Sequence, residues 1–233
     1  EVRCLSTGAL LRAHQLHTFS LHQHKQTLDD WNRAFRIALE RRIPRQHGLF
    51  LGLSSGVDSG LIALRLAEVG HPHHILSISG EENTSVIEAR HAYAQRQSRG
   101  AGIVHPMVRL SREEYDDEFD WAAQHIEEYQ YQSSRSGHRI KLLQDPGVIG
   151  LSLICRRAKE LGMRAYLSGG GGDEVYGNYR MIQKWPEDLR QIFPWKSFFF
   201  NEMRDYLRKE ELVAGAHGLE GRAQVGEGPG AKE

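Results

Sequence analysis

Serine, glycine and aspartate residues gather at residues 54–59, which read Ser-Ser-Gly-Val-Asp-Ser directly after the apolar run 49–53. An apolar run of this length predicts a buried strand, and the pattern from Leu61 to Ala67 predicts a helix that packs on a sheet. A helix that begins just after a strand binds anions, because its first backbone N–H groups and its dipole favour negative charge. The common mononucleotide loop carries Gly-Lys-Ser/Thr, but this loop has no lysine. Asp58 instead adds a carboxylate, which suits a divalent cation between protein and phosphate.

A second loop of similar composition follows the predicted strand 164–167 and reads Ser-Gly-Gly-Gly-Gly-Asp-Glu over residues 168–174. Four glycines after a buried strand are costly unless something approaches the backbone closely. Ligands of parallel sheets bind beyond the carboxyl ends of the strands, so we expect both loops to face one site. A cation bridged by Asp58 and Asp173 would hold phosphates there. The plainer alternatives are a capped strand-to-helix connection at the first loop and a flexible linker at the second.

The rest of the chain alternates between strand and helix patterns. A helix capped by Thr27 or Asp29 precedes the first loop, and Pro44 ends it. This alternation predicts the α/β class, with a parallel sheet covered by helices. The expected helices span 28–43, 84–97, 111 to about 131, and 145–162, and the expected strands span 74–79, 103–108 and 164–167. Residues 132–141 are polar and predict a loop.

Composition limits the classes of partner. Among 233 residues, Lys+Arg and Asp+Glu both number 30, so no net charge attracts nucleic acid or an anionic membrane. No apolar run approaches the ~20 residues that span a bilayer. The two cysteines, Cys4 and Cys155, provide no disulfide framework and indicate a reducing, cytoplasmic environment. His22 and His24 have the spacing of a metal chelate on one strand face, but a solvated edge strand accounts for them more simply.

The two loops resemble known motifs. Residues 54–59 are similar to the pyrophosphate loop of the N-type ATP pyrophosphatases, Ser-Gly-Gly-x-Asp-Ser, with Ser55 in a customary glycine position. Residues 168–174 resemble the Ser-Gly-x-Gly-Ala-Asp-Glu motif of the asparagine synthetase family. Further resemblances to this family lie at 28–31, 145–147, 192–195, 206–211 and 218–222, so the similarity covers about residues 10–222. It corresponds to the synthetase domain and implies an adenine nucleotide alpha hydrolase-like fold.

This resemblance implies that ATP and magnesium activate the side-chain carboxylate of aspartate as an acyl-adenylate, and that ammonia then displaces AMP. The implied roles are metal binding by Asp58 and Asp173, and catalysis by these two residues with Glu174. The positions that match the nucleotide-binding residues of the family are Gly52, Leu53, Ser54, Ser55, Gly56, Asp58, Ser59, Ile78, Ser168, Gly169 and Gly170.

Four departures from the family pattern qualify these expectations. Family members commonly carry Glu, a candidate for proton handling, where this chain has Gly170, and Ser55 replaces a glycine. After Arg222 the family continues with Pro-Phe-Leu-Asp and a helical segment that carries a catalytic lysine, whereas a Gly-rich sequence follows here. Cys4 lacks the setting of the nucleophilic cysteine that begins the glutaminase half of the family.

We therefore expect an N-terminal extension at 1–27, the ATP pyrophosphatase domain at 28–213 and a Gly-rich, disordered tail at 214–233. We expect a fragment that binds ATP with magnesium, does not hydrolyse glutamine, and catalyses weak or no aspartate-dependent pyrophosphate exchange.

Two other functions stay open. One is a relative that adenylates a different carboxylate, and the other is a non-catalytic remnant that binds nucleotide or a partner protein. A nucleic-acid-modifying pyrophosphatase is disfavoured by the zero net charge. The expected partners are aspartate and ammonia, the latter derived from glutamine by a domain outside these residues. We expect no nucleic acid and no membrane as partners, and a homodimer is an open assembly state.

Overall fold

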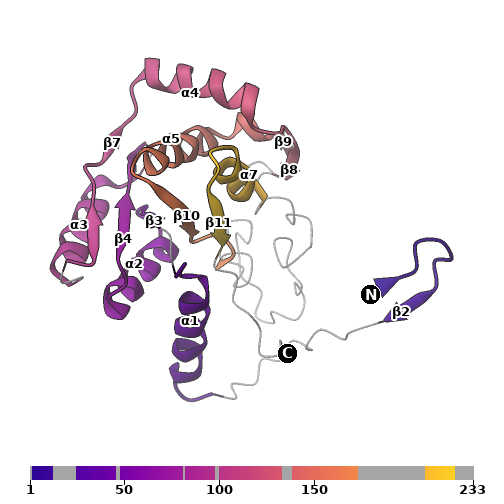
Figure 1. Ribbon diagram of the computed structural model, residues 1–233, viewed down its shortest axis with the longest axis horizontal. Helices are drawn as coiled ribbons and strands as arrows, with labels where there is room; N and C mark the ends of the chain where they lie inside the picture. The colour runs from indigo at the N-terminus through magenta and orange to yellow at the C-terminus, as the bar shows by residue number, and fades with distance from the viewer. Residues whose placement is uncertain are drawn as a thin grey trace.

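The protein is described by a computed structural model that covers residues 2–12, 25–45, 48–80, 82–97, 100–132, 138–172 and 208–223. Its centre is a five-stranded parallel sheet in the order β11-β10-β3-β4-β6 (Figure 1). The strands are β3 (Gly48–Gly52), β4 (His73–Leu76), β6 (Gly102–Val104), β10 (Met163–Ser168) and β11 (Glu220–Ala223). The α/β class with a parallel sheet is confirmed.

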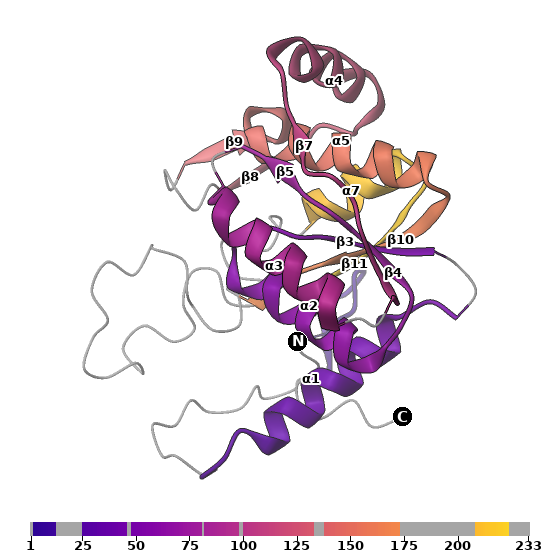
Figure 2. The same cartoon turned by 90° about the vertical axis from the view of Figure 1, so that its left-hand side faces the viewer.

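Helices cover both faces of the sheet, so the domain has three layers (Figure 2). One face carries α1 (Asp29–Arg42), α2 (Val57–Val69) and α3 (Thr84–Gln97). The other face carries α5 (Pro146–Glu160) and α7 (Arg208–Ala216), and α4 (Arg112–His125) packs against α5. The predicted helices at 28–43, 84–97 and 145–162 are confirmed within two residues at each end.

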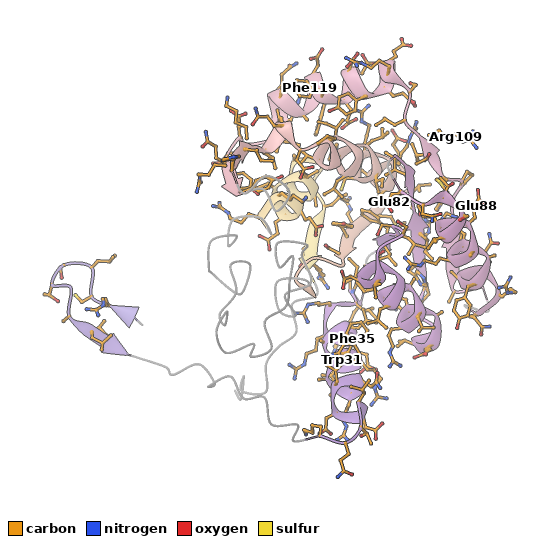
Figure 3. The ribbon with its side chains drawn as sticks, turned by 180° about the vertical axis from the view of Figure 1, so that it is seen from behind. Trp31, Phe35, Glu82, Glu88, Arg109 and Phe119 are labelled. Atoms are coloured by element: carbon orange, nitrogen blue, oxygen red, sulfur yellow. The ribbon has the colours of Figure 1, made fainter. Side chains whose placement is uncertain are left out.

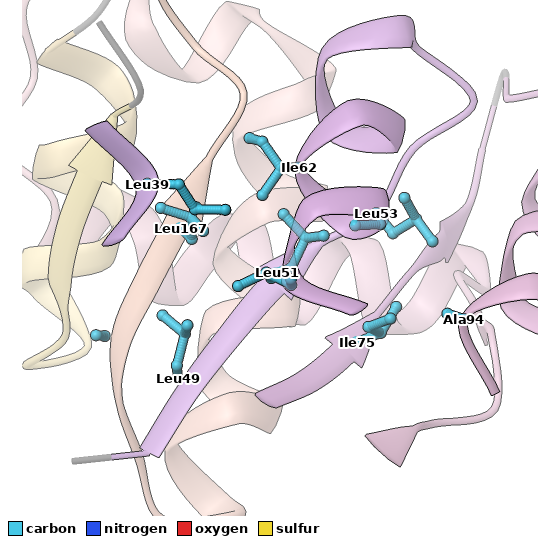
Figure 4. Packing of buried hydrophobic residues seen from close by; sticks show 11 residues of the cluster. Leu39, Leu49, Leu51, Leu53, Ile62, Ile75, Ala94 and Leu167 are labelled. Atoms are coloured by element: carbon cyan, nitrogen blue, oxygen red, sulfur yellow. The ribbon is translucent and has the colours of Figure 1, made fainter. Parts of the chain in front are cut away.

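The central strand β3 shows why the core forms on both faces. Leu49 and Leu51 are almost fully buried and pack with Ile62 of α2 (Figure 4). Phe50, which points to the opposite face, stacks on Tyr166 of β10 with ring centroids 5.0 Å apart. A strand buried on both faces has a continuous apolar sequence, because each face must exclude water.

The strand order reverses beside β3. The chain runs outward from β3 to β4 and β6, and then returns to place β10 and β11 on the other side of β3. In open parallel sheets, such a reversal opens a crevice at the carboxyl ends of the two strands involved, and ligands bind there. The loops that follow β3 and β10 are the two loops singled out in the sequence.

Two predicted strands are each split in the structure. The prediction of 74–79 corresponds to β4 and the short β5 (Ile78–Ser79), and that of 103–108 to β6 and β7 (Val108–Arg109). The break falls at Ser77, whose hydroxyl donates a hydrogen bond to the carbonyl of Leu53 at 2.7 Å. In the partner segment Pro106 interrupts the ladder, because proline has no N–H to donate. Beyond the break, β5 and β7 form a separate parallel pair.

The predicted helix from 111 to about 131 is too long, because α4 ends at His125. Downstream, β8 (Gln130–Gln132) and β9 (Arg139–Lys141) form an antiparallel pair in part of the predicted loop 132–141, and the 3-10 helix η1 (Leu142–Gln144) follows. The buried Tyr131 donates a 2.5 Å hydrogen bond from its hydroxyl to Asp145. This burial and the ladder with β9 favour a strand at the end of the segment 111 to about 131, where a helix was expected.

The start of the predicted tail at 214 also differs from the structure. Residues 214–223 comprise the end of α7 and the edge strand β11, with Ala214 and Leu219 buried against the sheet.

Near the other terminus, β1 (Val2–Arg3) and β2 (Leu10–Arg12) form an antiparallel hairpin that carries Cys4 in its turn. His22, His24 and residues 224–233 lie outside the described residues. Over the described ranges, every helix is too short or too polar to cross a bilayer.

Candidate functional site

The first loop is shaped by its own serines. The Ser54 and Ser59 hydroxyls lie 2.8 Å apart, and the Ser54 N–H donates to the Ser59 hydroxyl oxygen at 3.1 Å. The Gly56 N–H donates to the Ser54 hydroxyl oxygen at 3.0 Å. Gly56 is the N-cap of α2 and no side chain caps the helix there, so the alternative of a connection capped by Asp58 or Ser59 is not what forms. The hydroxyl pair fixes a tight turn at the positive end of α2.

The carboxylate of Glu82 forms hydrogen bonds with the first loop. The Ser55 N–H donates to Glu82 Oε2 at 2.8 Å, and the Ser55 hydroxyl donates to the same oxygen. Glu82 comes from the segment that precedes α3, where Figure 3 labels it. The loop amide therefore binds an anionic oxygen in this structure. Glu82 was not predicted from the sequence, where its signal was an acidic residue just beyond the predicted strand 74–79.

The side chain of Arg90 in α3 forms hydrogen bonds with the backbone of the first loop. Its Nη1 donates to the carbonyl oxygens of Ser54 and Gly56 at 2.7 and 2.5 Å. A Cβ at Gly60 would lie 2.7 Å from Arg90 Cζ, so only glycine leaves room for the guanidinium at that place. These contacts fix the carbonyls and bring a positive charge close to the anion-binding turn. Arg90 was also missed in the sequence; the glycine in the first turns of the predicted helix was its only signal.

The second loop meets the first at Asp58. A Cβ at Gly169 would lie 3.0 Å from Asp58 Cβ, and one at Gly172 would lie 2.6 Å from Asp58 Oδ1. Gly171 has a φ of 104°, a conformation that favours glycine. The prediction that something closely approaches the glycine run is confirmed, and the approaching group is Asp58. Asp173 and Glu174 lie outside the described residues.

The start of the second loop also contacts α7. The Ser168 hydroxyl donates a hydrogen bond to Glu210 Oε2, and the Gly170 N–H donates to the Ser168 hydroxyl oxygen at 2.9 Å. Glu210 is in the first turn of α7 and is partly exposed. It too was missed in the sequence, because only the packing of α7 against α5 and β11 brings it to the loop.

The remaining candidate nucleotide-binding positions divide between the two faces of the sheet. A Cβ at Gly52 would lie 3.2 Å from the Tyr166 ring, and Ile78 packs near Gly150 on the α5 face. Leu53 is buried on the α2 face. Its N–H donates to the carbonyl of Leu76 at 2.9 Å, and its carbonyl accepts a hydrogen bond from Ser77. Gly52 and Ile78 therefore lie on the α5 face of the sheet, whereas Leu53 supports the loop from the core.

The donor atoms at the meeting point of the loops are oxygens. In the described part of the chain, no three His, Cys, Asp or Glu side chains gather as a metal-binding group. Asp58 provides one carboxylate beside serine hydroxyls and backbone amides. Magnesium prefers such oxygen ligands and usually takes one or two carboxylates, with water and substrate phosphates completing the shell. The residues present therefore fit a magnesium–phosphate site.

A parallel sheet with glycine- and serine-rich loops where its strand order reverses defines an α/β nucleotide-binding domain. The model of the family described as asparagine synthase matches residues 30–226. The chain therefore belongs to the asparagine synthase family and has an adenine nucleotide alpha hydrolase-like fold. Membership of this family implies the use of ATP.

Two known proteins are similar to this chain in sequence or in structure. A protein provisionally named glutamine-hydrolysing asparagine synthetase 1, from Methanocaldococcus jannaschii, is 28% identical over 160 residues. The match covers 69% of this chain and 26% of that protein, so this chain spans about a quarter of its relative's length. The solved structure of NMN synthetase from Francisella tularensis aligns with a TM-score of 0.44 and 10% identity, over 86% of this chain and 90% of the other.

Proposed function

We propose that this domain activates the side-chain carboxylate of aspartate with ATP, and that ammonia then displaces AMP to give the amide. One observation carries the proposal: the serine loop after β3 and the glycine loop after β10 meet at Asp58. A site of this form provides backbone amides for phosphate and a carboxylate for a cation. In a full-length protein, ammonia would come from glutamine through a domain outside these residues.

Each loop has a proposed role in this reaction. Ser54, Ser55, Gly56 and Ser59 would bind the pyrophosphate, and their donors would stabilise the charge that develops on it as it leaves. Magnesium, when bound, would neutralise phosphate charge and orient the triphosphate. We propose Asp58 and Asp173 as its ligands, with Glu174 completing the catalytic acidic set. The proposed adenosine-side positions are Gly52, Leu53, Ile78, Ser168, Gly169 and Gly170.

A second candidate function is a non-catalytic remnant that binds nucleotide. The contact between Glu82 and Ser55 favours it, because a carboxylate there competes with phosphate for the same N–H. The third possibility is a relative that activates a different carboxylate. Such an enzyme would share the ATP-binding loops and would differ from an asparagine-forming enzyme in its substrate pocket. Substrate-dependent exchange distinguishes all three functions.

The test combines binding with exchange. Calorimetry of ATP, with and without magnesium, is expected to show magnesium-dependent binding that weakens in Asp58→Ala. Isotope exchange between pyrophosphate and ATP is expected to be weak but to require aspartate. Binding of equal affinity in all cases would refute the role of Asp58. Binding without exchange for any amino acid would favour the remnant, and exchange supported by a different carboxylate would change the substrate.

A further inference from the structure

The guanidinium of Arg90 binds the two carbonyl groups that flank Ser55 in the first loop. Its Nη1 donates to the carbonyl oxygens of Ser54 and Gly56, at 2.7 and 2.5 Å. A single cationic group therefore contacts two peptide units of the loop. Residues 54–59 themselves contain neither lysine nor arginine. Arg90 of α3 thus supplies a positive charge that the sequence of the loop lacks.

These contacts determine where two backbone N–H groups of the loop point. In a trans peptide unit, the C=O and the N–H that follows it point in opposite directions. Because the carbonyls of Ser54 and Gly56 point to Arg90, the N–H groups of Ser55 and Val57 point away from it. Val57 is the first residue of α2, and the first N–H groups of a helix have no acceptor within the helix. Both donors are thereby directed outward from the loop.

The Ser55 N–H already binds an anionic oxygen in this orientation. It donates to Glu82 Oε2 at 2.8 Å. A continuous chain of hydrogen bonds therefore leads from the Arg90 guanidinium, through the peptide unit between Ser54 and Ser55, to a carboxylate. Hydrogen bonds in such a chain polarise one another, so the cation on the carbonyl side makes the N–H a stronger donor. A phosphate oxygen that replaced the carboxylate would complete the same chain.

Gly60 leaves the space that this arrangement of Arg90 requires. A Cβ built on Gly60 would lie 2.7 Å from Arg90 Cζ and 3.0 Å from its Nε and Nη1. All three atoms belong to the guanidinium, so the end of the arginine side chain would have to move. Gly60 has no positive φ, and its backbone does not itself require glycine. The absence of a side chain at position 60 is therefore coupled to the guanidinium at position 90.

We propose that Arg90 is a positioning residue for the pyrophosphate part of the nucleotide, an inference that rests on the proposed function. It acts on the ligand through two peptide units of the loop rather than by direct contact. The N–H groups of Ser55 and Val57 would bind the pyrophosphate of ATP, and of the leaving product, in the orientation that Arg90 maintains. AMP lacks this pyrophosphate, so its binding gains nothing from Arg90.

The test measures the binding of magnesium pyrophosphate and of AMP by calorimetry. Arg90→Ala is expected to weaken the affinity for pyrophosphate by about 10–150-fold, which is the range for a hydrogen bond to a charged group. Its affinity for AMP is expected to stay at the wild-type value. Arg96→Ala is the matched control, because Arg96 is an exposed arginine in the last turn of the same helix. This control should bind both ligands as the wild type does.

A double-mutant cycle tests the coupling to position 60. Gly60→Ala keeps the charge of Arg90 but displaces the guanidinium, so it should also weaken pyrophosphate binding and leave AMP binding unchanged. In the Arg90→Ala background, the added methyl group has no guanidinium to displace. Gly60→Ala should then cause no further loss, and the two substitutions should be strongly non-additive. Urea unfolding checks that each variant is folded, and Gly60→Ala alone decides the outcome if Arg90→Ala does not fold.

Three results would overturn the proposal: wild-type pyrophosphate affinity in the folded variants, equal losses for pyrophosphate and AMP, or additive losses in the cycle. The failure of the proposed function would look different. If the wild-type protein binds neither ATP nor pyrophosphate in magnesium, the proposed function and this inference are both wrong. If the wild type binds both ligands and the variants at positions 60 and 90 bind them equally well, only this inference is wrong.

Discussion

Substituting Gly172 by alanine tests whether the contact between the two loops creates the nucleotide site. The new Cβ would lie 2.6 Å from Asp58 Oδ1 and 3.1 Å from its Cγ, whereas ordinary contacts begin at 3.4 Å. The Asp58 carboxylate must therefore retreat by about 1 Å, at a strain cost of about 0.5–1.5 kcal/mol if one torsion leaves its preferred rotamer. A charge-assisted contact of the displaced carboxylate is worth about 1.5–3 kcal/mol. ATP affinity in magnesium should fall by about 10–150-fold.

Calorimetry measures this effect, and urea unfolding checks that the fold persists. Gly215→Ala is the matched control, because no atom lies within 4 Å of its added Cβ and its φ is not positive. It replaces a helical glycine in α7, so it should leave ATP affinity unchanged and gain up to about 1 kcal/mol in stability. Wild-type affinity in a folded Gly172→Ala protein would refute the view that Asp58 positions the nucleotide.

Two further predictions concern other contacts. Glu82→Gln removes a negative charge that competes with phosphate at the Ser55 N–H, so the ATP affinity measured by calorimetry should rise about 2–10-fold. The control Glu88→Gln changes an exposed carboxylate in α3 and should leave the ATP affinity unchanged. Weaker ATP binding by Glu82→Gln would contradict this prediction. Burial lowers the pKa of His217 to about 4, so the unfolded chain binds more protons between pH 6.5 and 4. The stability provided by neutral His217 should be complete above pH 6.5, and about 1–3 kcal/mol of it should be lost as the pH falls to 4. Urea unfolding of wild type and His217→Gln should show a shallower pH dependence for the variant, and parallel curves would contradict the assignment.

The sequence predicted the parts of the site that are continuous in the chain. The apolar run of β3, the serine turn and α2 follow one another within about 20 residues, so local pattern sufficed to place Asp58 at the start of a helix that follows a tight turn. The glycine run after β10 correctly indicated that another group approaches its backbone closely. Glycine costs an ordered segment conformational entropy, so a run of glycines is expected where side chains would collide with a neighbouring group. The meeting of the two loops followed from the rule that ligands bind at the carboxyl ends of parallel strands.

The residues that the sequence did not reveal act across long separations. Glu82, Arg90 and Glu210 reach the loops from other elements, and their local sequence does not show which loop they contact. Glu118 shows the same difficulty in α4, where it is one of several acidic residues. It is fully buried, where it accepts a hydrogen bond from Ser152 and pairs with Arg156. Charge patterning cannot reveal such a residue, because its partners come from another helix.

The pairing of β3 with β10 fixes the order in which the sheet can assemble. More than a hundred residues separate the two strands, so β3 emerges from the ribosome long before its neighbour exists. At about 5–20 residues per second, β3 waits roughly 6–20 s with one edge unpaired. Until α5 and β10 arrive, the apolar surface of Phe50 and Leu76 also lacks its cover. Nascent chains are therefore vulnerable to aggregation through this edge, and the nucleotide site is among the last features of the domain to form.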